Sequence, residues 1–457
     1  MSGSMTYRPL VLSEMKRALD DKNSLFDAVD TYPTPLSVGL PSMVHENRDN
    51  FMDVARELNV RMRLFGAHKA TYSPSLVATL LGHGGVDVAS SWELRNAVAC
   101  GFEPSDIIAT GPKTTSFLRD LVQERATIIV DSPEELDRLT AVCIGEVSVL
   151  LRLTRTMIND QTITKRSRFG MDQAGFTDAL TILNRHPQIT LRGIAFHLDS
   201  QSITERVTAI QKAMDCLIDL QSQFPSATVL DIGGGYGANY GLSYEQAQLF
   251  ENTLKRAHKT GGSMHTWQGF SYGLDARAQL QGVELPAELS GADRLRAVLA
   301  STDSDGHMLA EMVNENLIEL WIEPGASLFH DAGFVVAEII EVRQLDDHQV
   351  VLVDAHRNQI CFENNEVLSD PLLIQRTPQE IKKTECVLLG HLCAESDLLS
   401  YRHIVFDTMP MAGDLLVWTH TGAYRSHFST STAIGHTSPT KLVYRHKTTI
   451  YEPEYES

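Results

Sequence analysis

Several residues of chemically useful types follow short apolar segments in this sequence of 457 residues. They are Lys69, His197, the glycine triplet at positions 233–235 and Glu323. A lysine amine can form a Schiff base with a carbonyl compound, and an imidazole can stack on an aromatic ring. Three consecutive glycines leave backbone N–H groups accessible to a phosphate. The set is typical of chemistry on a phosphorylated cofactor that carries an aldehyde.

The segments before these residues read as strands of a parallel sheet. Short runs rich in Val, Ile and Leu alternate with helix-like stretches from about residue 60 onward, as in a parallel sheet covered by helices. Eight such units predict an α/β fold, a closed (β/α)8 TIM-type barrel, with an open doubly wound sheet as the alternative. The expected strands are 61–68, 86–90, 106–110, 127–131, 147–153, 191–197, 227–232 and 317–322.

The residue types suit pyridoxal phosphate. Active sites of such barrels lie at the C-terminal ends of the strands, so residues that follow the strands meet on one rim. Pyridoxal phosphate needs a lysine, backbone N–H groups and a hydroxyl for its phosphate, and an acid that keeps its ring nitrogen protonated. Further polar residues near the predicted strand ends are Ser90, Ser91, Glu93, Arg152 and Ser200. We therefore expect pyridoxal 5'-phosphate as the cofactor and no metal.

Two domains and an N-terminal segment are expected. Residues 1–35 include a helix-like LSEMKRALDD and are predicted to pack on the second domain. Residues 36–325 are predicted to form the barrel, with an irregular insertion near 238–316 as a lid or surface excursion. In residues 326–457 strand-like runs follow one another without long helices, which predicts an antiparallel β domain.

Composition argues against several classes of partner. The net charge of −19 repels phosphate backbones and anionic lipid, so we expect neither a nucleic acid nor a membrane as partner. The sequence contains no stretch of 18 apolar residues and starts without a hydrophobic signal core. Its six cysteines form no CxxC pair and are expected to be reduced thiols in the cytoplasm.

The motifs, taken in order, resemble the pyridoxal-phosphate-dependent decarboxylases of the alanine-racemase-like fold, which include diaminopimelate, ornithine and arginine decarboxylases. Each motif alone is weak, but the ordered set covers nearly the whole chain. The resemblance implies decarboxylation of an amino acid to an amine and carbon dioxide. The matching segments are FGAHKATYSP (65–74), GVDVASSWELRNAVACGF (85–102), SRFGM (167–171), FHLDSQS (196–202), LDIGGGYG (230–237), IEPGASLFHDAG (322–333), GHLCAESDLL (390–399) and GDLLVWTHTGAY (413–424).

The resemblance also implies the roles of individual residues. Lys69 is expected to bind the cofactor covalently, His197 to stack on its ring, and Glu323 to pair with the ring nitrogen. Cys393 stands at the proton-donor position, which the partner subunit contributes in this family, and an obligate homodimer follows. The cofactor-binding residues implied in this way are Lys69, Asp87, Arg152, His197, Ser200, Gly233, Gly234, Gly235, Glu323, Gly325 and Tyr424.

Departures from the family pattern concern the distal end of the substrate. Ala326 replaces the arginine of the usual Glu-Pro-Gly-Arg, and Cys361-Phe362 stand where diaminopimelate enzymes place another arginine. Because arginine is the preferred partner of a carboxylate, this loss argues against diaminopimelate. Glu395 and Asp397 are predicted to bind a distal amine instead. We expect a basic amino acid such as ornithine or lysine, of either chirality, or a related biosynthetic intermediate, with polyamine biosynthesis as the setting.

Four alternatives stand beside this prediction. The first is diaminopimelate decarboxylation. The second is an amino acid racemase of the same fold, which would remove the Cα proton and keep the carboxylate. The third is a non-catalytic homologue that regulates a polyamine enzyme, against which the intact Lys69 and Cys393 count. The fourth is a metal-dependent barrel hydrolase, for which the sequence offers neither an HxH nor an HExxH ligand set.

Overall fold

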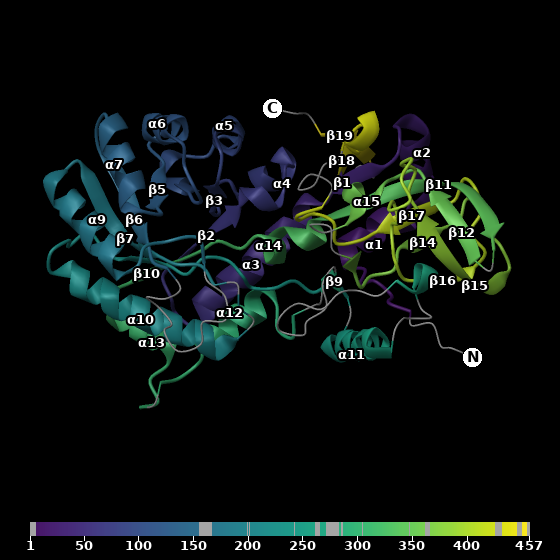
Figure 1. Ribbon diagram of the computed structural model, residues 1–457. Helices are drawn as coiled ribbons and strands as arrows, with labels where there is room; N and C mark the ends of the chain where they lie inside the picture. Colours follow the sequence, from purple (N-terminus) through teal and green to yellow (C-terminus); the bar gives the residue numbers. More distant parts are fainter. Residues whose placement is uncertain are drawn as a thin grey trace. The chain divides into compact units, whose positions relative to one another are not determined.

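The computed structural model divides into two compact units. The barrel unit contains Val44–Gly237 and Leu289–Leu328, and the sheet unit contains Met1–Met43, Ala238–Glu288 and Phe329–Tyr455. Figure 1 shows their helices and strands. The structure describes residues 6–154, 167–198, 200, 202–241, 243–260, 266–270, 283–284, 287–303, 305–346, 348–361, 366–425, 432–445 and 450–454.

Eight parallel strands close the barrel in the order β10-β2-β3-β4-β5-β6-β7-β8. Every predicted barrel strand overlaps one of them, so the (β/α)8 barrel is confirmed. Four of these strands, β3, β4, β5 and β8, are buried along their whole length, and the others are buried at most positions, so their sequences are rich in apolar residues. Their bounds are β2 (Met62–Ala67), β3 (Gly85–Val88), β4 (Ile107–Ala109), β5 (Thr127–Val130), β6 (Val147–Arg152), β7 (Ile189–Ala195), β8 (Val229–Asp231) and β10 (Glu319–Ile322).

Apolar side chains fill the barrel interior. Phe65 and Trp321 face each other with their ring centroids 4.7 Å apart. The cluster they belong to comprises Phe65, Ile108, Ile129, Leu150, Ala195, Val229 and Trp321. Because the interior is a packed core and no pore, polar chemistry is confined to the ends of the strands.

Helices cover the outside of the barrel strands (Figure 1). Several begin at a serine that caps the helix: Ser132 accepts a hydrogen bond from Glu135 N at 3.1 Å, and Ser202 one from Glu205 N at 3.2 Å. No helix in the described part of the chain is both long and apolar enough to cross a membrane. The helices of this unit are α3 (Pro41–Glu57), α4 (Pro74–Val77), α5 (Ser91–Cys100), α6 (Thr115–Gln123), α7 (Pro133–Val142), α9 (Gln173–Arg185), α10 (Ile203–Gln221), α12 (Gly291–Leu299), α13 (Leu309–Glu315) and α14 (Ala326–Phe329).

The main sheet of the other unit is mixed and not purely antiparallel as predicted. Its order is β16-β15-β12-β11-β1-β18-β19, with β17 pairing β11 and β14. The pairs β1–β18 and β12–β15 are parallel, and β1 from the N-terminal segment lies between β11 and β18. Its strands are β1 (Leu36–Gly39), β11 (Gly333–Leu345), β12 (His348–Val353), β14 (Leu372–Ile374), β15 (Ile381–Leu389), β16 (Ile404–Thr408), β17 (Leu415–Trp418), β18 (Thr440–Arg445) and β19 (Ile450–Pro453).

The remaining elements of the sheet unit are short or peripheral. They are α1 (Ser13–Asp20), α2 (Lys22–Thr31), α11 (Tyr244–Thr260), α15 (Arg357–Ile360) and the two-stranded parallel pair β9 (Val283–Glu284) and β13 (Glu366–Val367). The N-terminal segment packs within this unit: Tyr451 Oη donates to Ala18 O in α1 at 2.7 Å, and Tyr7 N, before α1, donates to Asp370 Oδ2 at 2.7 Å.

The insertion near 238–316 differs from the prediction, which assigned all of it to the barrel. Residues 238–288 group with the sheet unit, and only the part from Leu289 onward belongs to the barrel unit. Specific contacts explain the division. His330 Nε2 lies 3.1 Å from Asn239 O, and Phe270 stacks on Tyr401 at a centroid distance of 3.8 Å. Local composition gave no sign of these long-range partners.

Candidate active site

Lys69 lies directly after the first barrel strand. It occupies the 3-10 turn η1 (His68–Ala70) at the C-terminal end of β2. The turn is anchored by His68, which is fully buried and whose Nε2 lies 2.7 Å from Asn96 Nδ2. The lysine is therefore held at the predicted rim. Three acids act electrostatically on its ammonium group, namely Asp87, Glu93 and Glu323.

Three buried carboxyl groups, those of Asp87, Asp231 and Glu323, gather at the ends of β3, β8 and β10. Asp87 Oδ1 accepts a hydrogen bond from Thr110 Oγ1 at 2.6 Å, and Asp231 Oδ1 accepts one from Gly233 N at 2.8 Å. Within the described residues, Oδ2 of each aspartate meets no N–H or O–H donor. Burial raises the pKa of all three groups, that of Asp231 to about 7. Such a rim favours a cationic or proton-bearing ligand.

Glu93 and Arg152 complete the charged surroundings of the rim. Glu93 Oε2 accepts a hydrogen bond from Ala89 N at 2.5 Å, and burial raises the pKa of this carboxyl group to about 7. Arg152, the last residue of β6, has its Nη1 3.7 Å from Asp131 Oδ1. Its guanidinium also lies over the Phe169 ring, 4.8 Å from the centroid. One arginine thus faces the buried acids and offsets part of their charge.

The glycine loop after β8 approaches its neighbours too closely for side chains. A Cβ at Gly234 would lie 2.5 Å from Glu323 O. Gly235 has a φ of +83°, and a Cβ there would lie 2.8 Å from Arg206 Nη2. The loop is also bonded to the neighbouring strand, because Glu323 N donates to Gly233 O at 3.0 Å. The predicted loop and the predicted acid are therefore adjacent.

The guanidinium of Arg206 donates hydrogen bonds to backbone carbonyls of this loop. It belongs to α10, and its side chain is only 1% exposed. Nη2 donates to Leu198 O at 3.1 Å and to Gly234 O at 2.9 Å, and Nη1 donates to Ile232 O at 3.3 Å. One guanidinium therefore joins the loops that follow β7 and β8.

His197 and Ser200 lie in the loop after β7. Gly234 N donates to His197 Nδ1 at 3.3 Å, which orients the imidazole beside the glycine loop. Ser200 Oγ donates to Glu205 Oε2 and accepts from Ser202 N at 3.2 Å. The barrel unit thus brings together the predicted residues Lys69, Asp87, Arg152, His197, Ser200, Gly233, Gly234, Gly235, Glu323 and Gly325 at the C-terminal ends of its strands.

The other predicted residues belong to the sheet unit. Cys393 and Glu395 are exposed on the turn that follows β15. All six cysteines of the chain are free thiols. Tyr424 is half-buried and has a φ of +55°, on the loop that follows β17. Phe362, one of the departures noted above, lies outside the described residues.

Asp397 does not fit the substrate-binding role that the sequence predicted. Its side chain is 6% exposed, and its two carboxylate oxygens accept hydrogen bonds from Arg357 N and Leu392 N, both at 2.8 Å. The carboxylate also lies against Gly390, where any Cβ would clash with it. Asp397 therefore fixes the turn that carries Cys393, and its oxygens are already used by backbone amides.

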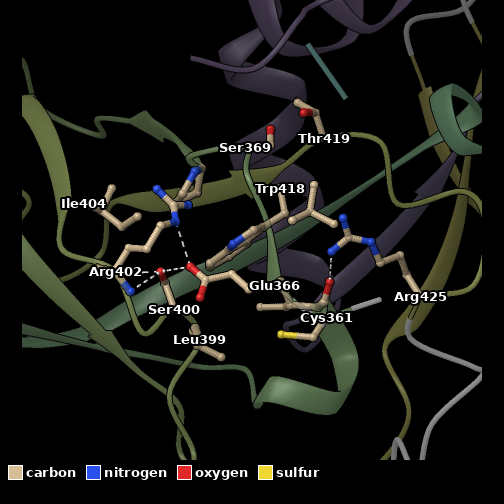
Figure 2. Close-up of a pocket in the computed structure, with 13 residues that line it drawn as sticks. Cys361, Glu366, Ser369, Leu399, Ser400, Arg402, Ile404, Trp418, Thr419 and Arg425 are labelled. Atoms are coloured by element: carbon tan, nitrogen blue, oxygen red, sulfur yellow. Dashed lines mark hydrogen bonds and ion pairs between the residues drawn. The ribbon is translucent and has the colours of Figure 1, made fainter. Parts of the chain in front are cut away.

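Figure 2 shows a pocket within the sheet unit that the sequence did not predict. Its volume of about 20 Å³ is enough for about one water molecule and far too small for an amino acid. The charged groups in its wall are engaged: Arg402 Nε donates to Glu366 Oε1 at 2.8 Å, and Arg425 Nη1 donates to Ile360 O (Figure 2). The pocket is therefore a small internal cavity of the sheet unit and no substrate site.

Comparison with known proteins identifies the family. Residues 45–264 match the family described as "Pyridoxal-dependent decarboxylase, pyridoxal binding domain". The chain is 31% identical over 414 residues to the uncharacterized protein y4yA of Sinorhizobium fredii, covering 88% of this chain and 85% of that protein. The chain belongs to the pyridoxal-dependent decarboxylases. A diaminopimelate decarboxylase of Bacillus subtilis is 25% identical, over 86% of this chain and 83% of that enzyme.

Solved structures of decarboxylases share this fold. Diaminopimelate decarboxylase from M. jannaschii in complex with L-lysine has a TM-score of 0.70 at 19% identity, over 95% of this chain and 92% of that one. Lysine decarboxylase from Selenomonas ruminantium has a TM-score of 0.64 at 20% identity, over 96% and 97% of the two chains. The present protein is a pyridoxal-phosphate-dependent amino acid decarboxylase, as predicted.

The barrel rim of this decarboxylase suits pyridoxal phosphate. The glycine loop is a cradle that any Cβ would fill, and such backbone is what a phosphate needs for close approach. The unsatisfied Oδ2 atoms of Asp87 and Asp231 mark an acidic pole, which suits a protonated ring nitrogen. Lys69, at the end of β2, supplies an amine that interacts electrostatically with Asp87 and Glu323. The residues present therefore fit the cofactor.

Two residues of the rim were missed by the sequence analysis. Asp231 lies inside the motif LDIGGGYG but was assigned no role. Arg206 lies in the first turns of a segment that was predicted to be a helix, and its side chain was also assigned no role. A signal for Asp231 was available, because a carboxylate at the end of a strand buried on both faces is exceptional. Arg206 had no such signal, since its acceptors are carbonyls of loops 8 to 29 residues distant in sequence.

Gly234→Ala is expected to weaken cofactor binding by about 5- to 150-fold, because the new methyl group must displace Glu323 O and overpacking costs about 1–3 kcal/mol. The measurement is a titration of the apoenzyme with pyridoxal phosphate, followed by absorbance. Gly175→Ala is the matched control, since its Cβ would meet atoms no closer than 3.5 Å. Equal affinities of the two variants would contradict the assignment of the loop.

Proposed function

We propose that this enzyme decarboxylates a basic amino acid, ornithine or lysine of either chirality or a related biosynthetic intermediate. The observation that carries the reaction is the barrel rim, where Lys69 stands among buried acids beside a cradle of glycines. The observation that supports the substrate is Ala326, which opens α14 where the family has an arginine.

The residues of the barrel hold the cofactor in this proposal. Bound pyridoxal phosphate supplies an electron sink for the electron pair left when carbon dioxide departs. Lys69 holds it through its amine, and Glu323 keeps a proton at its ring nitrogen. The glycine loop and Ser200 bind its phosphate, and His197 lies against its ring. Tyr424, which belongs to the sheet unit, is proposed as a further phosphate ligand. Gly325, Asp87 and Arg152 support these groups.

Cys393 is proposed as the acid that returns a proton to Cα of the substrate. Its thiol is exposed in the single chain, whereas an acid that protonates a carbon centre needs shelter from water. A homodimer in which each subunit contributes Cys393 to the site of the other provides that shelter. A cytoplasmic location remains a prediction from the cysteine usage.

Glu395 is proposed to bind the distal amine. It is exposed two residues after Cys393, while the carboxylate of Asp397 is occupied. The basic residue closest to the family's distal-carboxylate position is Arg357, and its guanidinium is engaged by Leu398 O at 3.2 Å and by the Tyr401 ring at 4.6 Å. The carboxylate of Glu395, together with an Arg357 guanidinium that is already engaged, favours an ammonium group over a second carboxylate.

Diaminopimelate decarboxylation is the second candidate. Relatives named diaminopimelate decarboxylase, from Aquifex aeolicus and Staphylococcus aureus among others, are 23% and 22% identical over 88% and 90% of this chain. Ala326 and the engaged Arg357 count against it. Racemisation on the same fold is a third outcome, which the experiment below separates.

A substrate screen tests the proposal. The purified enzyme with pyridoxal phosphate is given L- and D-ornithine, L- and D-lysine, L-arginine and meso-diaminopimelate, and carbon dioxide and amine are measured by mass. We expect ornithine or lysine to turn over fastest. Faster turnover of meso-diaminopimelate would contradict the proposed substrate class. Interconversion of enantiomers without release of carbon dioxide would contradict the proposed decarboxylation.

A further inference from the structure

Asp231 and Glu323 end two adjacent strands of the barrel. In the parallel pairing of β8 with β10, Asp231 stands opposite Trp321. Two backbone bonds continue the pairing beyond it, from Ile232 N to Trp321 O and from Glu323 N to Gly233 O, both at 3.0 Å. The carboxyl groups of Asp231 and Glu323 interact electrostatically, and each affects the pKa of the other. Their relative position is therefore fixed by the backbone of both strands.

The hydrogen bonds of Asp231 leave one of its buried oxygens without a donor, which a proton could satisfy. Asp231 is fully buried, and Glu323 is 8% exposed. Oδ1 of Asp231 accepts from Gly233 N at 2.8 Å, while its Oδ2 meets no donor group within the described part of the chain. Two ionised carboxylates can only accept, so they cannot bond each other without a proton between them. One shared proton satisfies Oδ2 and removes the repulsion between two buried charges.

One acid and two cations face the pair, and burial outweighs the cations. The acid Asp87 on β3 faces it, as do the cations Lys69 on η1 and Arg152 on β6. Burial, followed by the neighbouring acids, raises the pKa of Glu323 well above its ordinary value, and burial raises that of Asp231 to about 7. The two cations lower these values only in part. At neutral pH the pair therefore retains at least one proton.

We propose that Asp231 is a positioning residue, which shares one proton with Glu323 and holds that carboxylate toward the ring nitrogen of the cofactor. The inference rests on the proposed role of Glu323. When the protonated ring nitrogen is bound, the shared proton lies on Asp231 Oδ2 and the negative charge on Glu323. The proton moves between two oxygens of the pair, and no other reactant is needed. Asp231 thus acts as a neutral hydrogen-bond donor.

A neutral donor can be replaced by an amide, which gives a sharp test. In Asp231→Asn, Oδ1 still accepts from Gly233 N and the amide donates to Glu323. In Asp231→Leu, a side chain of similar size can neither accept a hydrogen bond from Gly233 N nor donate one to Glu323. We expect the dissociation constant of pyridoxal phosphate, measured by absorbance titration of the full-length apoenzyme, to change less than about threefold for Asn. For Leu we expect an increase of about 10- to 100-fold.

The pH dependence of the bound cofactor's absorbance is the second readout. The wild-type pair carries a titratable proton that the Asn variant lacks, so Asn is expected to remove one transition from the titration near neutral pH. A purely structural role for Asp231 would leave that transition in place. A loss of affinity in Asn as large as in Leu would overturn the proposal. If Leu does not fold, the Asn variant alone decides.

Glu323→Gln separates this inference from the proposed function. If this variant binds the cofactor with unchanged affinity and absorbance, the assignment of Glu323 fails and Asp231 has nothing to position. If Glu323→Gln is impaired and Asp231→Asn is equally impaired, only the shared proton fails.

Discussion

Lys69→Ala is expected to lower kcat by a factor of about 10³ or more, with cofactor no longer retained during gel filtration. The amine both holds the cofactor and moves protons at the site, and loss of a proton-transferring group costs about 10²–10⁴-fold on its own. The buried Lys113, which also acts on Asp87, is no substitute, because it is bonded to Glu135 Oε1 at 3.0 Å and to Ile129 O at 2.7 Å.

Amine release measured by mass, together with absorbance of the retained cofactor, checks this expectation. Lys16→Ala, on the exposed face of α1, is the control for removal of a positive charge, and we expect it to match the wild type. Activity of Lys69→Ala within about tenfold of the wild type would exclude the lysine from the reaction.

Mixing two inactive variants extends the test to the subunit arrangement. Cys393→Ala is expected to lose most of its activity because Cα receives no proton. If each site takes Lys69 from one subunit and Cys393 from the other, random exchange makes about half of the dimers hybrid, and each hybrid holds one intact site. We therefore expect recovery of about a quarter of the wild-type activity. No recovery between subunits shown to exchange would contradict the shared site.

Arg206→Met is expected to lower the stability of the barrel by about 3–5 kcal/mol. The substitution keeps the bulk of the side chain but removes the donors to Leu198 O, Ile232 O and Gly234 O. Each buried acceptor left without a donor costs about 1–3 kcal/mol. Because one of these carbonyls belongs to the glycine loop, cofactor affinity is expected to fall as well.

Urea denaturation of the apoenzyme, followed by circular dichroism, measures the effect without the stabilisation that a bound cofactor adds. Arg192→Met is the matched control, since Arg192 is an exposed residue of the neighbouring strand β7. An unfolding midpoint for Arg206→Met equal to that of Arg192→Met would show that the guanidinium does not hold the loops.

Local sequence was sufficient for the architecture of the barrel. Runs of Val, Ile and Leu bounded by helix caps such as Ser132 and Ser202 predicted all eight strands, because strands that are largely buried on both faces are rich in apolar residues. It was also sufficient for the reaction type, since Lys69, Gly233–Gly235 and Glu323 follow those strands and strand ends of a barrel converge. Both the strands and the residues that follow them can be recognised from residues adjacent in sequence.

Only the tertiary structure decided the features that depend on distant partners. The parallel pairing of β1 with β18 joins segments about 400 residues apart, and no local pattern encodes that register. The sequence predicted Asp397 as a substrate ligand, whereas in the fold both of its carboxylate oxygens accept hydrogen bonds from the backbone amides of Arg357 and Leu392. The pair of Asp231 and Glu323 exists only because β8 and β10 are adjacent in the closed barrel. Burial and hydrogen-bond satisfaction, which set the protonation of such groups, are properties of the assembled fold.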